Sequence, residues 1–156
     1  MTMAGRRGFT IVEILFVILI LSVVTTIVVI SFSKLNSTQA LRESTALVTS
    51  ILNEARSLTL SSKGDSQYGV HFEDSQVVLF KGATYSPTNP LNISTRINAL
   101  VGIRNVTLAG GGADVVFRRL TGETTASGTV ELFLQATPET VRVINIRATG
   151  LVEADS

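Results

Sequence analysis

The chain has 156 residues, of which 45% are hydrophobic, and its 13 basic side chains nearly balance its 12 acidic ones. This length is enough for one membrane element and one globular domain of ordinary size. Because the chain contains no cysteine, it can form neither a disulfide framework nor a thiolate metal site, and its near-neutral charge gives no electrostatic argument for a nucleic-acid partner.

The first predicted element is an apolar helix close to the N-terminus. Residues 14–33 include no charged side chain, and about 20 apolar residues are enough for a helix to cross the hydrocarbon core of a bilayer. Arg6 and Arg7 precede this segment, so the positive-inside rule predicts a cytoplasmic N-terminus. We therefore expect a single-pass anchor with its head on the far side of the membrane.

Glu13 places a single carboxylate at the start of this apolar run. An isolated charge in hydrocarbon costs at least about 2.5 to 3.5 kcal/mol, so a partner is expected. Cleavage after the small residue Gly8 would create an amino group on Phe9, four residues from Glu13, and a neighbouring subunit could bring the same amine against this carboxylate. The alternative is that Glu13 favours the helix N-terminal dipole, or snorkels to the interface, in an ordinary signal anchor.

The segment Gly8-Phe9-Thr10-Ile11-Val12-Glu13, with basic residues before it and an apolar run after it, resembles the class III signal of type IV prepilins and type II secretion pseudopilins. The resemblance implies that a prepilin peptidase cleaves after Gly8 and N-methylates Phe9. It also implies that Glu13 contacts the amine of an adjacent subunit in a helical filament. The chain departs from many pilins in having Val28-Val29-Ile30-Ser31 where they have a helix-kinking proline.

Helical spacing continues beyond the membrane segment. Apolar residues recur at Leu41, Val48, Ile51, Leu52, Ala55 and Leu58, which predicts an amphipathic helix. No proline or glycine interrupts the chain between Phe9 and Lys63, so we expect one continuous helix that stops at Ser61-Ser62-Lys63-Gly64.

From Tyr68 onward the apolar pattern has a period of two, which predicts a β-rich head. The predicted strands cover residues 68–72, 76–81, 104–109, 113–120, 129–136 and 141–148. Between them, residues 82–101 contain Pro87 and Pro90 and are predicted to form a long loop. The fold class is therefore α+β, with a long helix packed on a small antiparallel β-sandwich. We expect a leader at 1–8, a membrane and assembly helix at 9–33, an amphipathic helix at 34–63 and the head at 64–156.

The head is similar to that of minor pilins of the GspH and FimT type. The similarity rests on a two-sheet pattern that includes Val115-Val116-Phe117 and a last strand ending in Ile144-Asn145-Ile146-Arg147-Ala148-Thr149-Gly150. Members of this family are low-abundance subunits near the filament tip or in its priming complex. The resemblance implies a structural subunit in the bacterial inner membrane whose partners are other pilins and the prepilin peptidase.

No pattern in the head predicts an enzyme, a metal site or a cofactor. His71 is the only histidine, so it lacks a second imidazole for zinc, and no serine lies in a nucleophile-elbow sequence. Gly110-Gly111-Gly112 has no Gly-Lys-Ser/Thr after it and is predicted to be a turn. Glu73-Asp74 and Asp114 are candidate calcium ligands by residue type, but no dense run of oxygen ligands accompanies them, so no calcium site is predicted.

Arg118, Arg119, Arg142 and Arg147 are the residues that a DNA-binding alternative would use. Some FimT-like minor pilins bind DNA during uptake through an arginine-rich C-terminal segment, whereas this chain ends with acidic residues at 153 and 155. Residues 142 and 147 also differ by an odd number, which places them on opposite faces of a regular strand. We therefore expect a structural subunit of a type II secretion or type IV pilus filament, with a DNA-uptake or adhesion receptor at the pilus tip as the alternative.

Overall fold

The computed structural model describes residues 9–155, and for residues 30, 33 and 34 it describes the backbone alone. The predicted leader, including Gly8, lies outside the described residues. The chain divides into two compact units, one ending at Asn36 and the other beginning at Ser37.

Helix α1 (Ile11–Leu60) contains both predicted helical segments. The expectation of a continuous helix is confirmed, since α1 runs unbroken through residues 28–31, where the kinking proline is missing. The helix ends at Leu60, close to the predicted stop. Ser62 and Gly64 then take left-handed backbone conformations, with φ of 49° and 59°, which end a helix because they turn its last carbonyls away from the axis. A single turn of 3-10 helix, η1 (Lys63–Asp65), follows.

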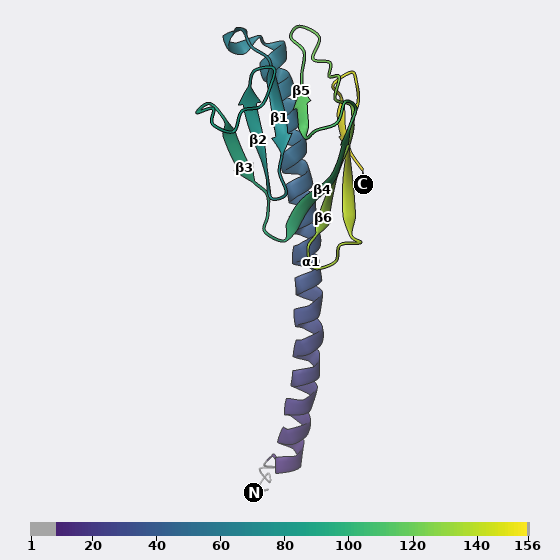
Figure 1. The fold of residues 1–156 in the computed structure, drawn as a ribbon. Helices are drawn as coiled ribbons and strands as arrows, with labels where there is room; N and C mark the ends of the chain where they lie inside the picture. Colours follow the sequence, from purple (N-terminus) through teal and green to yellow (C-terminus); the bar gives the residue numbers. More distant parts are fainter. Residues whose placement is uncertain (1–8, 156) are drawn as a thin grey trace, which may run out of the picture. The chain divides into compact units, whose positions relative to one another are not determined.

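Eight strands in the described residues form two antiparallel sheets of four strands each (Figure 1). The first sheet has the order β3-β2-β1-β5. Its strands are β1 (Tyr68–Phe72), β2 (Gln76–Lys81), β3 (Ile93–Arg96) and β5 (Asp114–Val116). The second sheet has the order β4-β6-β7-β8. Its strands are β4 (Val101–Leu108), β6 (Gly128–Leu134), β7 (Val141–Ile146) and β8 (Val152–Ala154). The predicted α+β fold class is confirmed.

The strand predictions are best for the interior strands of the first sheet and poorest at the sheet edges. Strands β1 and β2 have the predicted bounds. The prediction of a loop over residues 82–101 was wrong in part, because β3 pairs with β2 and β4 begins at Val101. Strand β8 was not predicted, and β5 ends at Val116 instead of residue 120. The short β5 has a local cause, since Phe117 makes only an isolated bridge with Thr124.

The hydrophobic core of the unit 37–155 lies between α1 and both sheets. The amphipathic pattern is confirmed, because the apolar positions of the helix are buried while Arg42 and Glu43 are exposed. Fully buried side chains of this core include Leu52 from the helix, Val77 from the first sheet and Leu132 from the second. Each side chain of this kind contributes about 1.5 to 3 kcal/mol through burial.

Arg56 connects α1 to two loops of the head. Its Nε donates a hydrogen bond to the carbonyl of Gly122 at 3.2 Å, and one terminal nitrogen donates to the carbonyl of Thr149 at 3.5 Å. Gly150 lies against the same Gly122 carbonyl. It has a left-handed φ of 77°, and a Cβ at this position would collide with that carbonyl. The turn after β7 therefore depends on glycine both for its backbone conformation and for space.

A charged cluster occupies the β4 edge of the second sheet. The ladder between β4 and β6 shifts register between Arg104 and Thr107, and Asn105 has a φ of 49° there. Glu131 accepts hydrogen bonds from Asn105 at 2.8 Å and from Arg104 at 2.9 and 2.6 Å. These bonds, with that of Asn105 the largest cause, hold the pKa of Glu131 below its ordinary value. Irregular pairing and charge at an edge strand hinder pairing with another chain.

Candidate functional site: the N-terminal assembly helix

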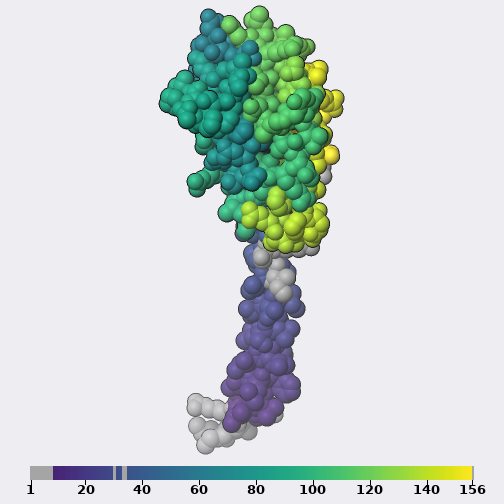
Figure 2. All heavy atoms as spheres, in the orientation of Figure 1, coloured from purple at the N-terminus to yellow at the C-terminus, as the bar shows by residue number. Residues whose placement is uncertain are grey.

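The first part of α1 is an apolar surface with nothing packed on it. Residues Ile11–Val29 have a mean hydropathy of 2.9, none of this segment is buried, and its length and composition suffice to cross a membrane. Figure 2 shows these side chains, in purple, exposed along the visible face of the helix. Soluble monomeric proteins rarely expose a continuous apolar surface of this size to water. The segment therefore requires a bilayer or other apolar helices around it.

Hydroxyl side chains along this part of the helix are satisfied locally. Each donates to a backbone carbonyl three or four residues earlier, at 2.7 to 3.0 Å: Ser22 to Leu19, Thr25 to Leu21, Thr26 to Ser22 and Ser31 to Ile27. A polar group left without a partner in hydrocarbon costs several kcal/mol. Since the hydroxyls bond to their own helix, they add little to the cost of placing it in an apolar environment.

Thr10 caps the start of α1. Its Oγ1 accepts a hydrogen bond from the N–H of Glu13 at 3.2 Å, and its carbonyl accepts one from the N–H of Ile14. Thr10 and Glu13 thus take the first and fourth positions of the Thr-x-x-Glu pattern that begins many helices. The sequence interpretation treated this segment as a cleavage motif and missed the cap, although the spacing of these two residues was the available signal.

The carboxylate of Glu13 has neither a hydrogen bond nor an ion pair within residues 9–155. It lies in the first turn of α1, where the N-terminal dipole favours a negative charge. Phe9 precedes the capped turn and is 78% exposed. This geometry is compatible with both interpretations of Glu13, the dipole one and the pairing with an amine on Phe9 of another subunit.

Three of the four candidate arginines bond to oxygen atoms of the described chain. Arg119 pairs with Asp65 at 2.5 Å and Arg147 with Glu153 at 2.7 Å, while Arg142 donates to the carbonyl of Asp155 at 3.0 Å. Arg118 borders a polar hollow beside Asp114. Arg142 borders a different groove, together with Arg42. The residues do not line a common hollow in the part of the head that the structure describes.

His71 and two of the candidate calcium ligands, Glu73 and Asp114, have side-chain partners in the described chain. His71 Nδ1 lies 2.5 Å from Asp114 Oδ1, and its ring stacks on Tyr85 with centroids 4.0 Å apart. Glu73 accepts a hydrogen bond from Gln76 at 2.7 Å. Among the described residues no group of three or more His, Cys, Asp or Glu side chains is placed to hold a metal ion.

Gly110-Gly111-Gly112 forms the predicted turn, since all three residues have positive φ and they connect β4 to β5.

Comparison with known proteins yields one sequence motif and one fold. Residues 3–29 match the prokaryotic N-terminal methylation motif, and no curated protein matches the chain. The type IV minor pilin FimU of Pseudomonas aeruginosa strain PAO1 is similar in two crystal forms. The TM-scores are 0.57 and 0.60, both at 14% identity, covering 74% and 76% of this chain and 93% and 90% of FimU. The chain therefore carries a prokaryotic N-terminal methylation motif ahead of a head that has the fold of the type IV minor pilin FimU.

Proposed function

We propose that this chain is a minor structural subunit of a type II secretion pseudopilus or a type IV pilus, that it is not an enzyme, and that it assembles through its N-terminal helix. The observation that carries the proposal is the exposed apolar helix, whose single carboxylate has no partner in the described chain and lies four residues beyond Phe9. The methylation motif covers the same residues.

In this proposal the peptidase removes residues 1–8 by cleaving after Gly8 and then methylates the new amine of Phe9. Methylation keeps the amine protonatable, so it retains a charge that can pair with a carboxylate. The amine is then close to Glu13 of a neighbouring subunit. The amine and the carboxylate then offset the desolvation cost that either charge would have if it were alone in an apolar environment.

Pairing at Glu13 also explains how a uniformly apolar helix finds one register. The side chains of Ile11–Val29 present apolar surface throughout, and apolar packing by itself allows several neighbouring alignments. A buried polar contact excludes the alignments that leave it unpaired, as single polar residues do in coiled coils. Glu13 therefore determines the alignment, and its removal also weakens association because the amine of the neighbouring subunit is left unpaired.

The domain arrangement and topology follow from the same proposal. Residues 9–33 form the membrane and assembly helix, residues 34–63 the amphipathic helix, and residues 64–156 the head. Arg6 and Arg7 keep the leader in the cytoplasm. The chain is then a single-pass protein of the bacterial inner membrane before assembly, with its head in the periplasm or outside the cell.

The DNA-uptake or adhesion receptor ranks below the structural role. Phosphate binding needs several cationic side chains on one face. Here Arg119 and Arg147 pair with carboxylates, and Arg142 bonds to a carbonyl near the acidic end of the chain. Exposed pairs of this kind are individually weak, so a titration with DNA is a real test of the alternative.

The structural role is tested by following the tagged chain in cells that make the filament. We expect it to co-purify with sheared filaments and to remain in the membrane fraction when the prepilin peptidase is inactivated. The major subunit in the same preparations is the control for filament recovery. The proposal fails if filaments are recovered without the chain, or if the chain enters them without the peptidase.

A further inference from the structure

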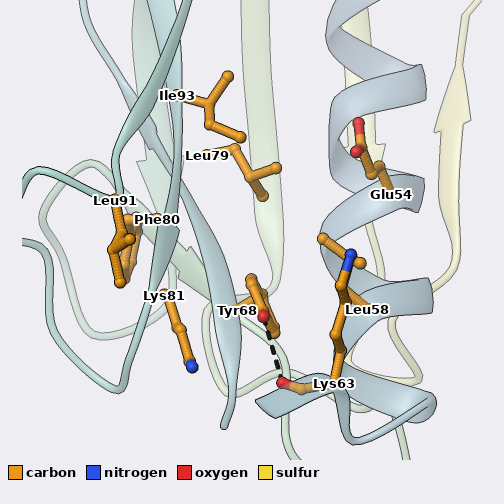
Figure 3. Close-up of a pocket in the computed structure, with 9 residues that line it drawn as sticks. All are labelled: Glu54, Leu58, Lys63, Tyr68, Leu79, Phe80, Lys81, Leu91 and Ile93. Carbon is orange, nitrogen blue, oxygen red and sulfur yellow. Dashed lines mark hydrogen bonds between the residues drawn. The ribbon is translucent and has the colours of Figure 1, made fainter.

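A groove lies between the end of α1 and the β3 side of the first sheet (Figure 3). Its volume is about 320 Å³, which is the lower part of the range typical of ligand sites. Its lining residues are Glu54, Leu58, Lys63, Tyr68, Leu79, Phe80, Lys81, Leu91 and Ile93. Leu91 and Ile93 are 61% and 60% exposed. The groove is therefore an apolar surface open to solvent.

Two lysines line the groove. Lys63 belongs to η1, and a Cβ at the neighbouring Gly64 would lie 2.6 Å from Lys81 Nζ. Neither lysine forms an ion pair in the described part of the chain. Glu54 lies further along α1, and in Figure 3 the Lys63 side chain extends along the helix in its direction while Lys81 points away from it. The groove thus has an apolar floor bordered by two ammonium groups and one carboxylate.

The open edge of β3 borders the groove. Ile97 donates to the carbonyl of Ser75, so alternate residues of β3 bond to β2. By this alternation the backbone N–H and C=O groups of Ser94 and Arg96 point away from the sheet. Nothing in residues 9–155 pairs with them, since β3 is the last strand on its side. The edge offers two sets of backbone groups to a further strand.

We propose that the groove binds an extended acidic segment of a partner protein, which adds a strand to β3. Ile93 lies opposite Leu79 in the register and shares its face of the sheet. An added strand would therefore place an aliphatic side chain beside Ile93, on the open side of the groove that Leu58 and Leu79 line. In strand addition of this kind, backbone hydrogen bonds provide the affinity, and every second side chain of the added strand provides the specificity.

The charged side chains around the groove indicate that the bound segment is acidic. A carboxylate of the segment lies beside Lys63 and Lys81, because their ammonium groups attract it and Glu54 would repel it. Arg96 has no carboxylate partner in the region described and attracts a second acidic side chain on the other face of β3. A fatty acid would satisfy the apolar floor and the lysines but would leave the backbone of Ser94 and Arg96 unused. The site lies within residues 54–96, so it does not depend on assembly through the N-terminal helix.

The test uses the full chain in nanodiscs of zwitterionic lipid and a fluorescein-labelled octapeptide in which valine alternates with glutamate, except that one terminal valine position also carries glutamate. This extra glutamate supplies the carboxylate on the face of Lys81, since the other glutamates lie on the face of Arg96. Fluorescence anisotropy should show saturable binding, and a valine and lysine peptide should not bind. The double variant Lys63→Glu/Lys81→Glu should weaken binding roughly tenfold or more, since each exposed pair contributes up to about 1 kcal/mol. Ser94→Pro should abolish binding, because it removes the outward N–H without touching the ladder to β2.

Two variants control for indirect effects. Ser94→Ala keeps the backbone donor and should bind normally, and Arg142→Glu changes a cation on the second sheet and should have no effect. Circular dichroism of each variant checks that the head is folded. The proposal is overturned if the peptide does not bind at about 1 mM, the weak limit of a single site, or if neither the lysine variant nor Ser94→Pro changes its affinity. If the peptide does not bind but decanoate does, and the lysine variant weakens decanoate binding, the groove is a site for amphiphiles and the strand-addition proposal is wrong.

Discussion

The substitution Glu13→Gln distinguishes the two interpretations of the carboxylate in the assembly helix. Glutamine has the size of glutamate and keeps the backbone N–H that bonds to Thr10 Oγ1. The variant should therefore insert into the membrane and keep its capped first turn. It should lose only the charge, and with it the pairing to the amine of a neighbouring subunit.

The two interpretations differ in the size of the expected effect. If Glu13 pairs with an amine, its loss leaves that amine alone in an apolar environment, at a cost of about 2.5 kcal/mol or more, equivalent to about 70-fold in association. If Glu13 only favours the helix dipole, the loss is about 0.3 to 1 kcal/mol, or at most about fivefold. The intervals do not overlap, so one quantitative assay can decide.

Thr10→Ala is the matched control, because it removes the cap but keeps the carboxylate. Loss of a threonine cap typically costs about 1 kcal/mol of helix stability. The assay is the amount of tagged chain in purified filaments, normalised to the amount in the membrane. Pairing predicts a large loss for Glu13→Gln and little change for Thr10→Ala. Equal, small losses in the two variants would refute the pairing argument and support the dipole.

Four further predictions concern processing, stability and nucleic acid. Gly8→Phe should leave uncleaved precursor in the membrane on immunoblots, since the peptidase acts at a small residue; normal cleavage would contradict the proposed site. Gly150→Ala should destabilise the head by at least about 2 kcal/mol in thermal unfolding, and by more than Gly111→Ala, whose φ is also positive but whose Cβ meets nothing within 4 Å. Wild type should be more stable than Glu131→Gln at neutral pH, and this difference should disappear as the pH falls through the lowered pKa of Glu131. A stability difference that stays constant in acid would show that the charge is not responsible. In anisotropy titrations DNA should bind no tighter than about 10⁻⁴ to 10⁻⁶ M at physiological salt, whereas sub-micromolar binding with a steep salt slope would favour the receptor.

The parts of the fold that could be predicted are those where burial imposes a period. The helix could be predicted through residue 60 because no proline or glycine interrupts it. Strands β1 and β2 could be predicted because the polar turn Glu73-Asp74-Ser75 separates two apolar runs. Strand β3 has the burial pattern of an exposed edge, with no alternation to detect. Strand β8 has three residues, which is too short for any periodicity.

The site could be predicted only in its local part. Gly8, Phe9 and Glu13 are neighbours in the sequence, so their pattern was visible without a structure. Arg119 pairs with Asp65, which is 54 positions away in the sequence, and Leu58 and Ile93 line the same groove. Contacts of this range depend on the register of the first sheet, which no local pattern specifies.

The N-terminus of the mature chain is the most direct test of the proposed assembly route. The chain should be purified from membranes of cells that contain a prepilin peptidase and analysed by intact mass and N-terminal sequencing. We expect a chain that begins with N-methylated Phe9 and retains the whole of α1. A chain that still begins with Met1 in the presence of the active peptidase, or one that begins beyond Phe9, would contradict the proposal.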